Sequence, residues 1–231
     1  MNLYKTILFF FLTLAITPVV NAQNKVIFKE NFRKNDLRKN WLSLNGDWNV
    51  KDSGIQGNKD ANWAILLCNK PLSENYILTF SSLAEPGTYL FEVMLNLNQN
   101  KFLGILLNQF ENRVSIEDRG LFANLDMTGS FIHSVGHIGT MPKVERPKEH
   151  TWQDWKIQRA GNEFFIWINN QAITSFRDAT GFVKPKGQFG FAINGKASIR
   201  HVKLIKTKGE SSVPPKDFKG KPRIKPFFVF E

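Results

Sequence analysis

The sequence predicts an all-β protein, a sandwich of two antiparallel sheets. Beyond residue 23, apolar and polar residues alternate with a period of two, and no long segment follows the 3.6-residue period of an amphipathic helix. Runs of strand length are separated by turn residues at intervals typical of sandwiches. The 231 residues are enough for one hydrophobic core and too few for two ordinary domains beside a leader and a tail.

Residues 1–22 are predicted to be a signal peptide. Lys5 precedes the apolar run Ile7–Ile16, and the small side chain of Ala22 suits cleavage before Gln23. The apolar run is too short to cross about 30 Å of hydrocarbon as a helix, so an uncleaved anchor is the weaker alternative. We therefore expect an exported protein, periplasmic or extracellular, with no transmembrane segment after cleavage.

The predicted domain, 23–206, begins with an alternating strand at Val26–Phe32 and a second strand around Trp48–Val50. Gly54 and Gly57 indicate a tight reversal after it. Four further strands, rich in aromatic and aliphatic residues, are expected at Tyr76–Phe80, Tyr89–Leu97, Phe102–Asn108 and Arg113–Glu117.

The region Gly120–His150 interrupts this pattern with glycines, prolines and three of the four histidines. We expect a long loop here, and long loops inside a compact domain are often functional. His133 and His137 are four residues apart, a spacing that could ligate zinc or manganese on a helix. The residues between them are poor helix formers and no third ligand is fixed by spacing, so we expect no metal site.

Consecutive hairpins are expected to complete the domain. Three strands are predicted at Trp152–Arg159, Glu163–Ile168 and Ala172–Phe176. A last hairpin is expected to turn at Asn194-Gly195, since this dipeptide suits a type I′ turn. Residues 207–231 then form a basic, proline-rich tail whose apolar end packs on the sandwich or contacts a partner in the cell envelope.

The chain is strongly basic and has one cysteine. Its formal net charge of +11 favours anionic partners such as an acidic polysaccharide. The lysines are not interleaved with aromatic residues as in a nucleic-acid groove, so we expect no nucleic-acid partner. Cys68 has no second cysteine to pair with, and its apolar neighbours predict a buried small side chain rather than a nucleophile.

Two groups of motifs flank the centre of the chain. The opening group consists of Phe28-x-Glu30-x-Phe32, Trp41, Gly46-x-Trp48-x-Val50 and Gly54-Ile55-x-Gly57. The closing group consists of Thr151–Ile157, Gly161-Asn162, Trp167–Asn170, Phe189-Gly190-Phe191 and Ile199-Arg200. In this order they resemble the 3-keto-disaccharide hydrolase-like family of concanavalin-A-like jelly rolls. The resemblance implies a jelly roll that acts on oligosaccharides whose glucose is oxidised at C3.

This resemblance implies a site on the central strands, where the sequence departs from the family. Asn108 stands where an arginine is expected, Arg113 replaces an acid, Ser115 replaces an amide, and Asp118 alone is kept. A C3 ketone acidifies the C2 proton, so that a base beside a cation or metal can expel the C1 substituent. The resemblance therefore suggests Asp118, Arg113 and the loop residue His137 as catalytic groups.

The remaining polar positions predict a sugar-facing surface. A period of two places Arg113, Ser115 and Glu117 on one face of their strand, although an ordinary solvated face fits equally well. We expect substrate contacts from Asn108, Ser115, Glu117, His133, Trp63 and Trp152. Three functions stay open: a glycosidase-like enzyme, a non-catalytic carbohydrate-binding module, and an envelope-associated structural protein. The sequence does not identify a cofactor.

Overall fold

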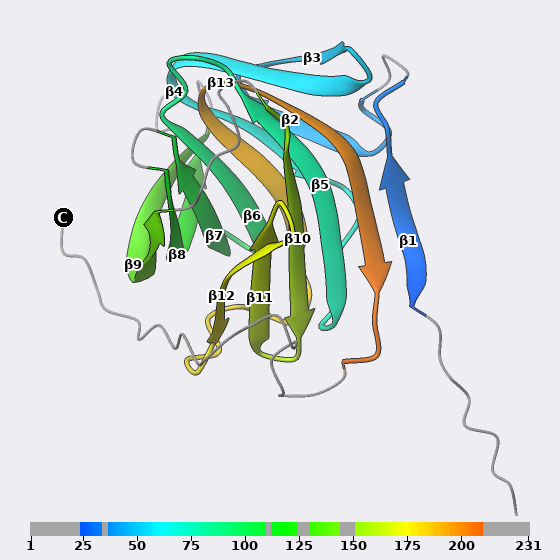
Figure 1. Cartoon of the computed structure of the whole chain (residues 1–231), viewed down its shortest axis with the longest axis vertical. Coiled ribbons are helices and arrows are strands. Elements are labelled where there is room, and N and C mark those ends of the chain that lie inside the picture. The colour runs from blue at the N-terminus through cyan, green and yellow to red at the C-terminus, as the bar shows by residue number, and fades with distance from the viewer. Residues whose placement is uncertain (1–23, 34–36, 110–111, 124–129, 144–150, 210–231) are drawn as a thin grey trace, which may run out of the picture.

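The computed structural model describes residues 24–33, 37–109, 112–123, 130–143 and 151–209 (Figure 1). Within these residues the chain forms thirteen strands and no helix. The strands are β1 (Lys25–Glu30), β2 (Trp41–Asn45), β3 (Asp47–Lys51), β4 (Gly54–Cys68), β5 (Tyr76–Ala84), β6 (Leu90–Asn98), β7 (Lys101–Asn108), β8 (Arg113–Ala123), β9 (Ser130–Lys143), β10 (Gln153–Ala160), β11 (Glu163–Ile168), β12 (Gln171–Arg177) and β13 (Gln188–Lys206).

The predicted signal peptide and nearly all of the tail lie outside the described residues. In the part of the chain that is described, no helix has the length and apolar character needed to cross a membrane.

Two antiparallel layers share the long strands β4 and β13. On one side, residues 188–194 of β13 pair with β6, and β7, β8 and β9 follow in this order. On the other side, the same part of β13 pairs with the last residues of β4, which pair in turn with β2. We call this layer sheet I. Residues 197–206 of β13 pair with β5, and β10, β11 and β12 follow in this order. Strand β1 pairs with the end of β13 on its other side. This layer, with β3 and the first residues of β4, is sheet II.

The main core lies between the two sheets. Alternate residues turn inward from each sheet, such as Phe91 and Ile105 from sheet I and Leu78 and Trp155 from sheet II, and all four are at most 2% exposed. The indole Nε1 of Trp155 donates a hydrogen bond to Ser82 Oγ at 2.9 Å, so its polar atom is satisfied inside the core. This arrangement confirms the predicted all-β jelly-roll sandwich.

Cys68 belongs to this core, as predicted. Its side chain is fully buried, and burial raises the pKa of its thiol to about 12. A thiol with this pKa is not a nucleophile at neutral pH.

Sheet I also has an apolar cluster on its outer face, away from the main core. Trp63, Met94 and Phe102 belong to it, together with Ile132 from β9. The edge strand β9 contacts β4, which lies on the far side of β13, β6, β7 and β8. Sheet I is therefore strongly curled, and its outer face is concave and partly filled.

The predicted long loop at Gly120–His150 is wrong over most of its described part. Strand β8 continues to Ala123, and β9 occupies 130–143. The pairing of β8 with β9 shifts register between Ile116 and Glu117 and again between Asp118 and Arg119, and Gly136 and Gly139 lie at these shifts. Glycines at bulges inside a strand resemble the glycines of a loop when only the sequence is known.

The predicted last hairpin is also wrong, because β13 does not reverse at Asn194-Gly195. Ile193 pairs with Ala64 and Gly195 pairs with Lys59, so both sides of the dipeptide run along the same strand, β4. Gly195 has φ +115°, and a Cβ there would lie 2.6 Å from the Cα of Thr88. This glycine permits a bend where β13 passes from sheet I to sheet II.

The reversal expected around Gly54 and Gly57 lies earlier in the chain. Asp52 and Ser53 have positive φ values of 49° and 60° and form the turn between β3 and β4. Gly57 is a strand residue that leaves room for the ring of Trp48. The hairpin predicted from Glu163–Ile168 and Ala172–Phe176 is confirmed, and its turn residues Asn169 and Asn170 have φ values of 51° and 61°.

Candidate functional site

The concave outer face of sheet I holds a buried group of charged side chains. Glu92 interrupts the otherwise apolar first part of β6, and the strand period places it on the side opposite Phe91 and Val93, which belong to the main core. Glu117 and Arg119 are two residues apart on β8 and reach the same face. The three side chains come from β6 and β8, and β7 lies between these two strands.

Arg119 binds both carboxylates. Its Nε lies 3.1 Å from Glu92 Oε1 and an amino nitrogen lies 3.3 Å from Glu92 Oε2, so this pair is bidentate. Its other amino nitrogen donates to Glu117 Oε2 at 2.9 Å. The exposed fraction of the side chain rises from 0% for Glu92 to 8% for Arg119 and 15% for Glu117. Glu117 is therefore the member of this triad nearest to the surface.

Gly104 and Trp63 shape the space around the triad. A Cβ at Gly104 would lie 2.2 Å from Glu92 Oε1 and 2.6 Å from Arg119 Cγ, so only glycine leaves room for the ion pair here. The Arg119 guanidinium carbon lies 5.7 Å from the centre of the Trp63 ring, within the range of a cation–π contact. The triad thus lies between a glycine and an aromatic ring.

Burial dominates the protonation of Glu92. Loss of water raises the pKa of Glu92 to about 7, although Arg119 lowers it through charge and hydrogen bonds, and Glu117 adds a smaller upward effect. Near neutral pH, Glu92 therefore exchanges a proton while it stays in contact with Arg119. The group has a net charge of zero when Glu92 is protonated and Glu117 is ionised.

Besides Trp63, four of the predicted site residues share this face. Asn108 pairs with Arg113 across β7 and β8, and Ser115 and Glu117 follow at alternate positions. Arg113 is exposed, while the other three are half-buried. Together they form a polar strip along the hairpin, beside the buried triad.

Asp118 lies on the other side of β8. Its neighbours at alternate positions, Val114 and Ile116, belong to the main core, so it does not share a face with Arg113 or Glu117. Burial first, and the charge of Asp178 second, raise the pKa of Asp118 to about 7. The structure therefore does not bring Asp118 and Arg113 together.

The predicted histidines lie on β9. The backbone of His137 pairs with Glu117, but its side chain is outside the described residues. His133 pairs with Gly120, is exposed, and meets the ring of Phe122 edge-on at 6.1 Å. Among the residues that the structure describes, no three His, Cys, Asp or Glu side chains are grouped to hold a metal ion.

Of the two predicted tryptophans, Trp63 belongs to sheet I, whereas Trp152 precedes β10 and contacts sheet II. Trp63 lies beside the triad on sheet I and is 8% exposed. The guanidinium carbon of Arg200 lies 3.9 Å from the ring centre of Trp152. Arg200 belongs to the part of β13 that pairs within sheet II. Trp152 is therefore not part of the concave face.

Glu92 and Arg119 are site residues that the sequence pattern did not reveal. A single signal was available, since a charged residue inside the apolar strand Phe91–Leu97 requires a partner when both faces are covered. The identity of that partner depends on the register of β6, β7 and β8, which the sequence does not give.

Comparison with known proteins gives a fold and no family. No protein-family model and no curated protein matches the sequence. The structure is similar to the carbohydrate-binding module CBM66 from Bacillus subtilis, with a TM-score of 0.56 and 16% identity over 73% of this chain and 96% of that chain. A protein of unknown function with a galectin-like fold, also from Bacillus subtilis, gives 0.61 and 12% over 80% and 98%.

A laminarinase from Rhodothermus marinus gives a TM-score of 0.58 and 9% identity over 80% of this chain and 98% of that chain. At these identities the likeness concerns the fold alone, so it does not show membership of the 3-keto-disaccharide hydrolase-like family. The chain thus has a jelly-roll fold of the kind found in a carbohydrate-binding module, a galectin-like protein and a laminarinase.

Proposed function

We propose that this protein binds glycans on the concave face of sheet I. The observation that carries the proposal is the position of the polar strip Asn108, Arg113, Ser115 and Glu117 beside the buried Arg119 ion pairs. Amide, guanidinium, hydroxyl and carboxylate groups together can donate and accept hydrogen bonds to sugar hydroxyls. The fold also occurs in a carbohydrate-binding module, which supports the same function.

The triad contributes preorganisation to this proposed site. Arg119 holds Glu117 in place, and Glu92 and Trp63 hold Arg119. A carboxylate fixed in this way loses little conformational entropy when a ligand binds. Glu117 is therefore assigned a binding role, and Glu92 and Arg119 are assigned positioning roles.

Binding fits the geometry better than hydrolysis does. Glu92 has no exposed surface, and both carboxylates of the triad are occupied by Arg119. Most glycosidases use two carboxyl groups that flank the scissile bond. A sugar could reach Glu92 only if Arg119 and its neighbours moved.

A second candidate function is the cleavage of glycosidic bonds, including those of 3-keto glucosides. The observation that favours it is the difference between the two carboxyl groups, since Glu92, with a pKa near 7, could supply a proton beside Glu117. Incubation of the protein with glucans and with 3-keto glucosides tests this candidate. Product that disappears in Glu92→Gln would support catalysis, whereas no product with any substrate would exclude it.

The binding proposal is tested by titrating the protein with a panel of neutral and anionic oligosaccharides. We expect Arg113→Ala and Asn108→Ala each to weaken binding by about tenfold, because each removes at least one hydrogen bond to the ligand. Lys51→Ala, at an exposed position on β3, is the matched control and is expected to leave the affinity unchanged. If Arg113→Ala and Asn108→Ala bound every ligand as tightly as Lys51→Ala does, the assignment of binding to this face would be contradicted.

We place this activity outside the cytoplasm, on the strength of the leader-like residues 1–22. Mass measurement of the protein recovered from the periplasm or the medium should show a chain that starts at Gln23. Recovery of the protein only from the cytoplasm, with Met1 retained, would contradict export.

A further inference from the structure

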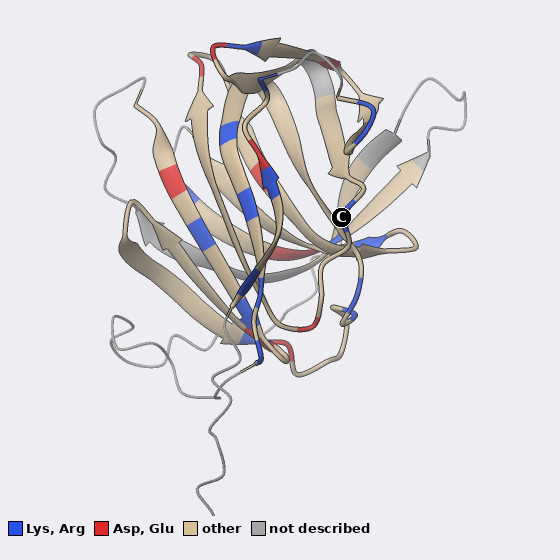
Figure 2. Ribbon diagram, turned by 90° about the vertical axis from the view of Figure 1, so that its right-hand side faces the viewer, with Lys and Arg blue, Asp and Glu red and all other residues tan. Residues whose placement is uncertain are grey.

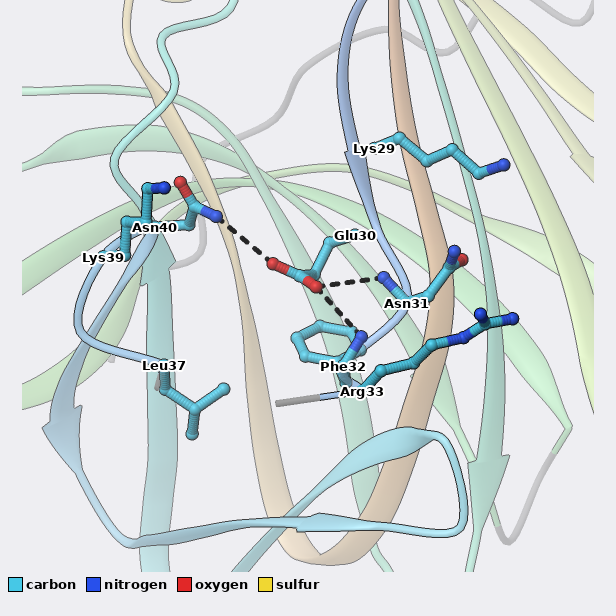
Figure 3. A pocket seen from close by; sticks show the side chains of 8 residues that line it. All are labelled: Lys29, Glu30, Asn31, Phe32, Arg33, Leu37, Lys39 and Asn40. Atoms are coloured by element: carbon cyan, nitrogen blue, oxygen red, sulfur yellow. Dashed lines mark hydrogen bonds between the residues drawn. The ribbon is translucent and has the colours of Figure 1, made fainter. Parts of the chain in front are cut away.

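A separate cavity of about 470 Å³ lies where the chain leaves β1 and approaches β2 (Figure 3). Its polar lining residues are Lys29, Glu30, Asn31, Arg33, Lys39 and Asn40. The volume lies in the range of roughly 300–1,000 Å³ that is typical of small-ligand sites. This cavity shares no residue with the concave face of sheet I.

Glu30 fixes the shape of this cavity. Its Oε1 accepts hydrogen bonds from the backbone N–H groups of Asn31 at 3.0 Å and Phe32 at 2.9 Å. Its Oε2 accepts from Asn40 Nδ2 at 3.3 Å, which joins the two sides of the cavity. Phe32 has φ 51°, is 1% exposed and packs against Trp41 with ring centres 5.5 Å apart, so it anchors the turn in the core.

The cavity is positively charged. Figure 3 shows Lys29, Asn31 and Arg33 on one side of Glu30 and Lys39 with Asn40 on the other. Among the described residues, Lys29, Arg33 and Lys39 have no ion-pair partner. Glu30, the carboxylate among the described lining residues, already accepts three internal hydrogen bonds, and the described lining carries three cations against this one carboxylate.

Positive charge is found over the whole molecule as well as at this cavity. Figure 2 shows Lys and Arg spread over many strands and loops of the molecule, a distribution that favours anions without selecting one site. The cavity adds geometry to that attraction, since each side of Glu30 carries at least one cation beside an asparagine amide. Arginine can hold an oxyanion with two hydrogen bonds, and lysine adds a point charge.

We propose that this cavity binds the sulfate or carboxylate substituent of an acidic oligosaccharide. The cations neutralise the oxyanion, and the asparagine amides hydrogen-bond the adjoining sugar hydroxyls. This inference rests on the proposed glycan binding, and it makes the cavity a second contact that selects acidic chains among the glycans presented to the concave face.

The test compares three ligands on the full chain: a sulfated oligosaccharide, its desulfated counterpart and vesicles that contain anionic phospholipid. The variant Lys29→Ala/Arg33→Ala/Lys39→Ala is expected to bind the sulfated ligand at least tenfold more weakly. It is expected to keep its affinity for the desulfated ligand. The control Lys51→Ala/Lys186→Ala/Lys196→Ala removes three exposed lysines elsewhere and should leave both affinities within twofold.

Three results would overturn the inference. The control variant could lose as much affinity for the sulfated ligand as the cavity variant, which would show unspecific attraction. The cavity variant could bind both sugars as the unaltered protein does, or it could lose only its binding to vesicles, which would assign the cavity to a lipid phosphate. Circular dichroism and thermal unfolding of both triple variants establish that each is folded.

The same titrations separate this inference from the proposed function. If only the concave face is wrongly assigned, Arg113→Ala binds normally while the cavity variant still loses the sulfated ligand. If only the cavity is wrongly assigned, Arg113→Ala loses affinity and the cavity variant does not.

Discussion

Glu92 links the stability of the protein to pH. Its folded-state pKa of about 7 lies above the ordinary value of 4.5, so the folded chain binds more protons than the unfolded chain between these values. The contribution of Glu92 is therefore fully present below about pH 4.5 and is lost as the pH rises to about 7. Asp118, with its pKa raised from 3.8 to about 7, acts in the same direction and in an overlapping window.

We expect Glu92→Gln to flatten this pH dependence. Between pH 5 and pH 8, the decrease in the free energy of unfolding should be smaller in Glu92→Gln than in the unaltered protein by ~1–3 kcal/mol. Urea unfolding at the two pH values measures it. Glu92→Gln/Asp118→Asn should flatten the dependence further. An unchanged pH dependence in Glu92→Gln would show that Glu92 titrates normally in the folded chain.

Residue patterns show how far the site can be predicted. A period of two correctly places Arg113, Ser115 and Glu117 on one face of β8, because alternation is a local property of a strand. The contact of Glu92 with Arg119 joins residues 27 positions apart across an intervening strand. It depends on the register and on the space left by Gly104, which no local pattern contains.

At the scale of elements, Arg159 on β10 holds the segment between β12 and β13. Its guanidinium donates to the carbonyl oxygens of Gly161 at 2.6 Å, Lys184 at 2.7 Å and Val183 at 3.2 Å. Burial lowers the pKa of Arg159. Val183 belongs to the main core, so the hydrogen bonds of Arg159 attach this segment to the sandwich where the segment enters the core.

We expect Arg159→Lys to destabilise the fold by about 2–4 kcal/mol, because lysine keeps the charge but cannot reach three carbonyl groups in this planar arrangement. Arg177→Lys is the matched control, since the Arg177 side chain is 43% exposed and its ion-pair partner among the described residues is Glu163. That control should change stability by less than about 0.5 kcal/mol. Chemical unfolding measures both variants, and equal losses would contradict the role of Arg159.

Strand lengths and connections show where local patterns fail. The hairpins at β10, β11 and β12 follow from alternating residues and turn dipeptides and are confirmed. Strands β9 and β13 were interrupted in the prediction because Gly136, Gly139 and Gly195 were assigned to a loop and a turn. In the structure these glycines lie at shifts of strand pairing, where tertiary pairing decides whether the chain continues or reverses.

At the scale of the whole molecule, the curl of sheet I creates the concave face. Strand β9 comes round to β4, and the apolar cluster of Trp63, Met94, Phe102 and Ile132 covers part of this face. The polar strip on β7 and β8 lies on the same face as this cluster, and its residue Arg113 is exposed. The all-β sandwich followed from the period of two and the spacing of turn residues, and the jelly roll was implied by the family resemblance, whereas this curl follows from long-range pairing.

The most direct test of glycan binding on this face is an NMR titration of the ¹⁵N-labelled protein with the tightest-binding neutral oligosaccharide from the panel. The largest backbone amide shifts should fall at Asn108, Arg113, Ser115 and Glu117, with smaller changes on sheet II. Shifts confined to sheet II would contradict glycan binding on the concave face. The absence of shifts with every member of the panel, at the highest ligand concentration used, would contradict it as well.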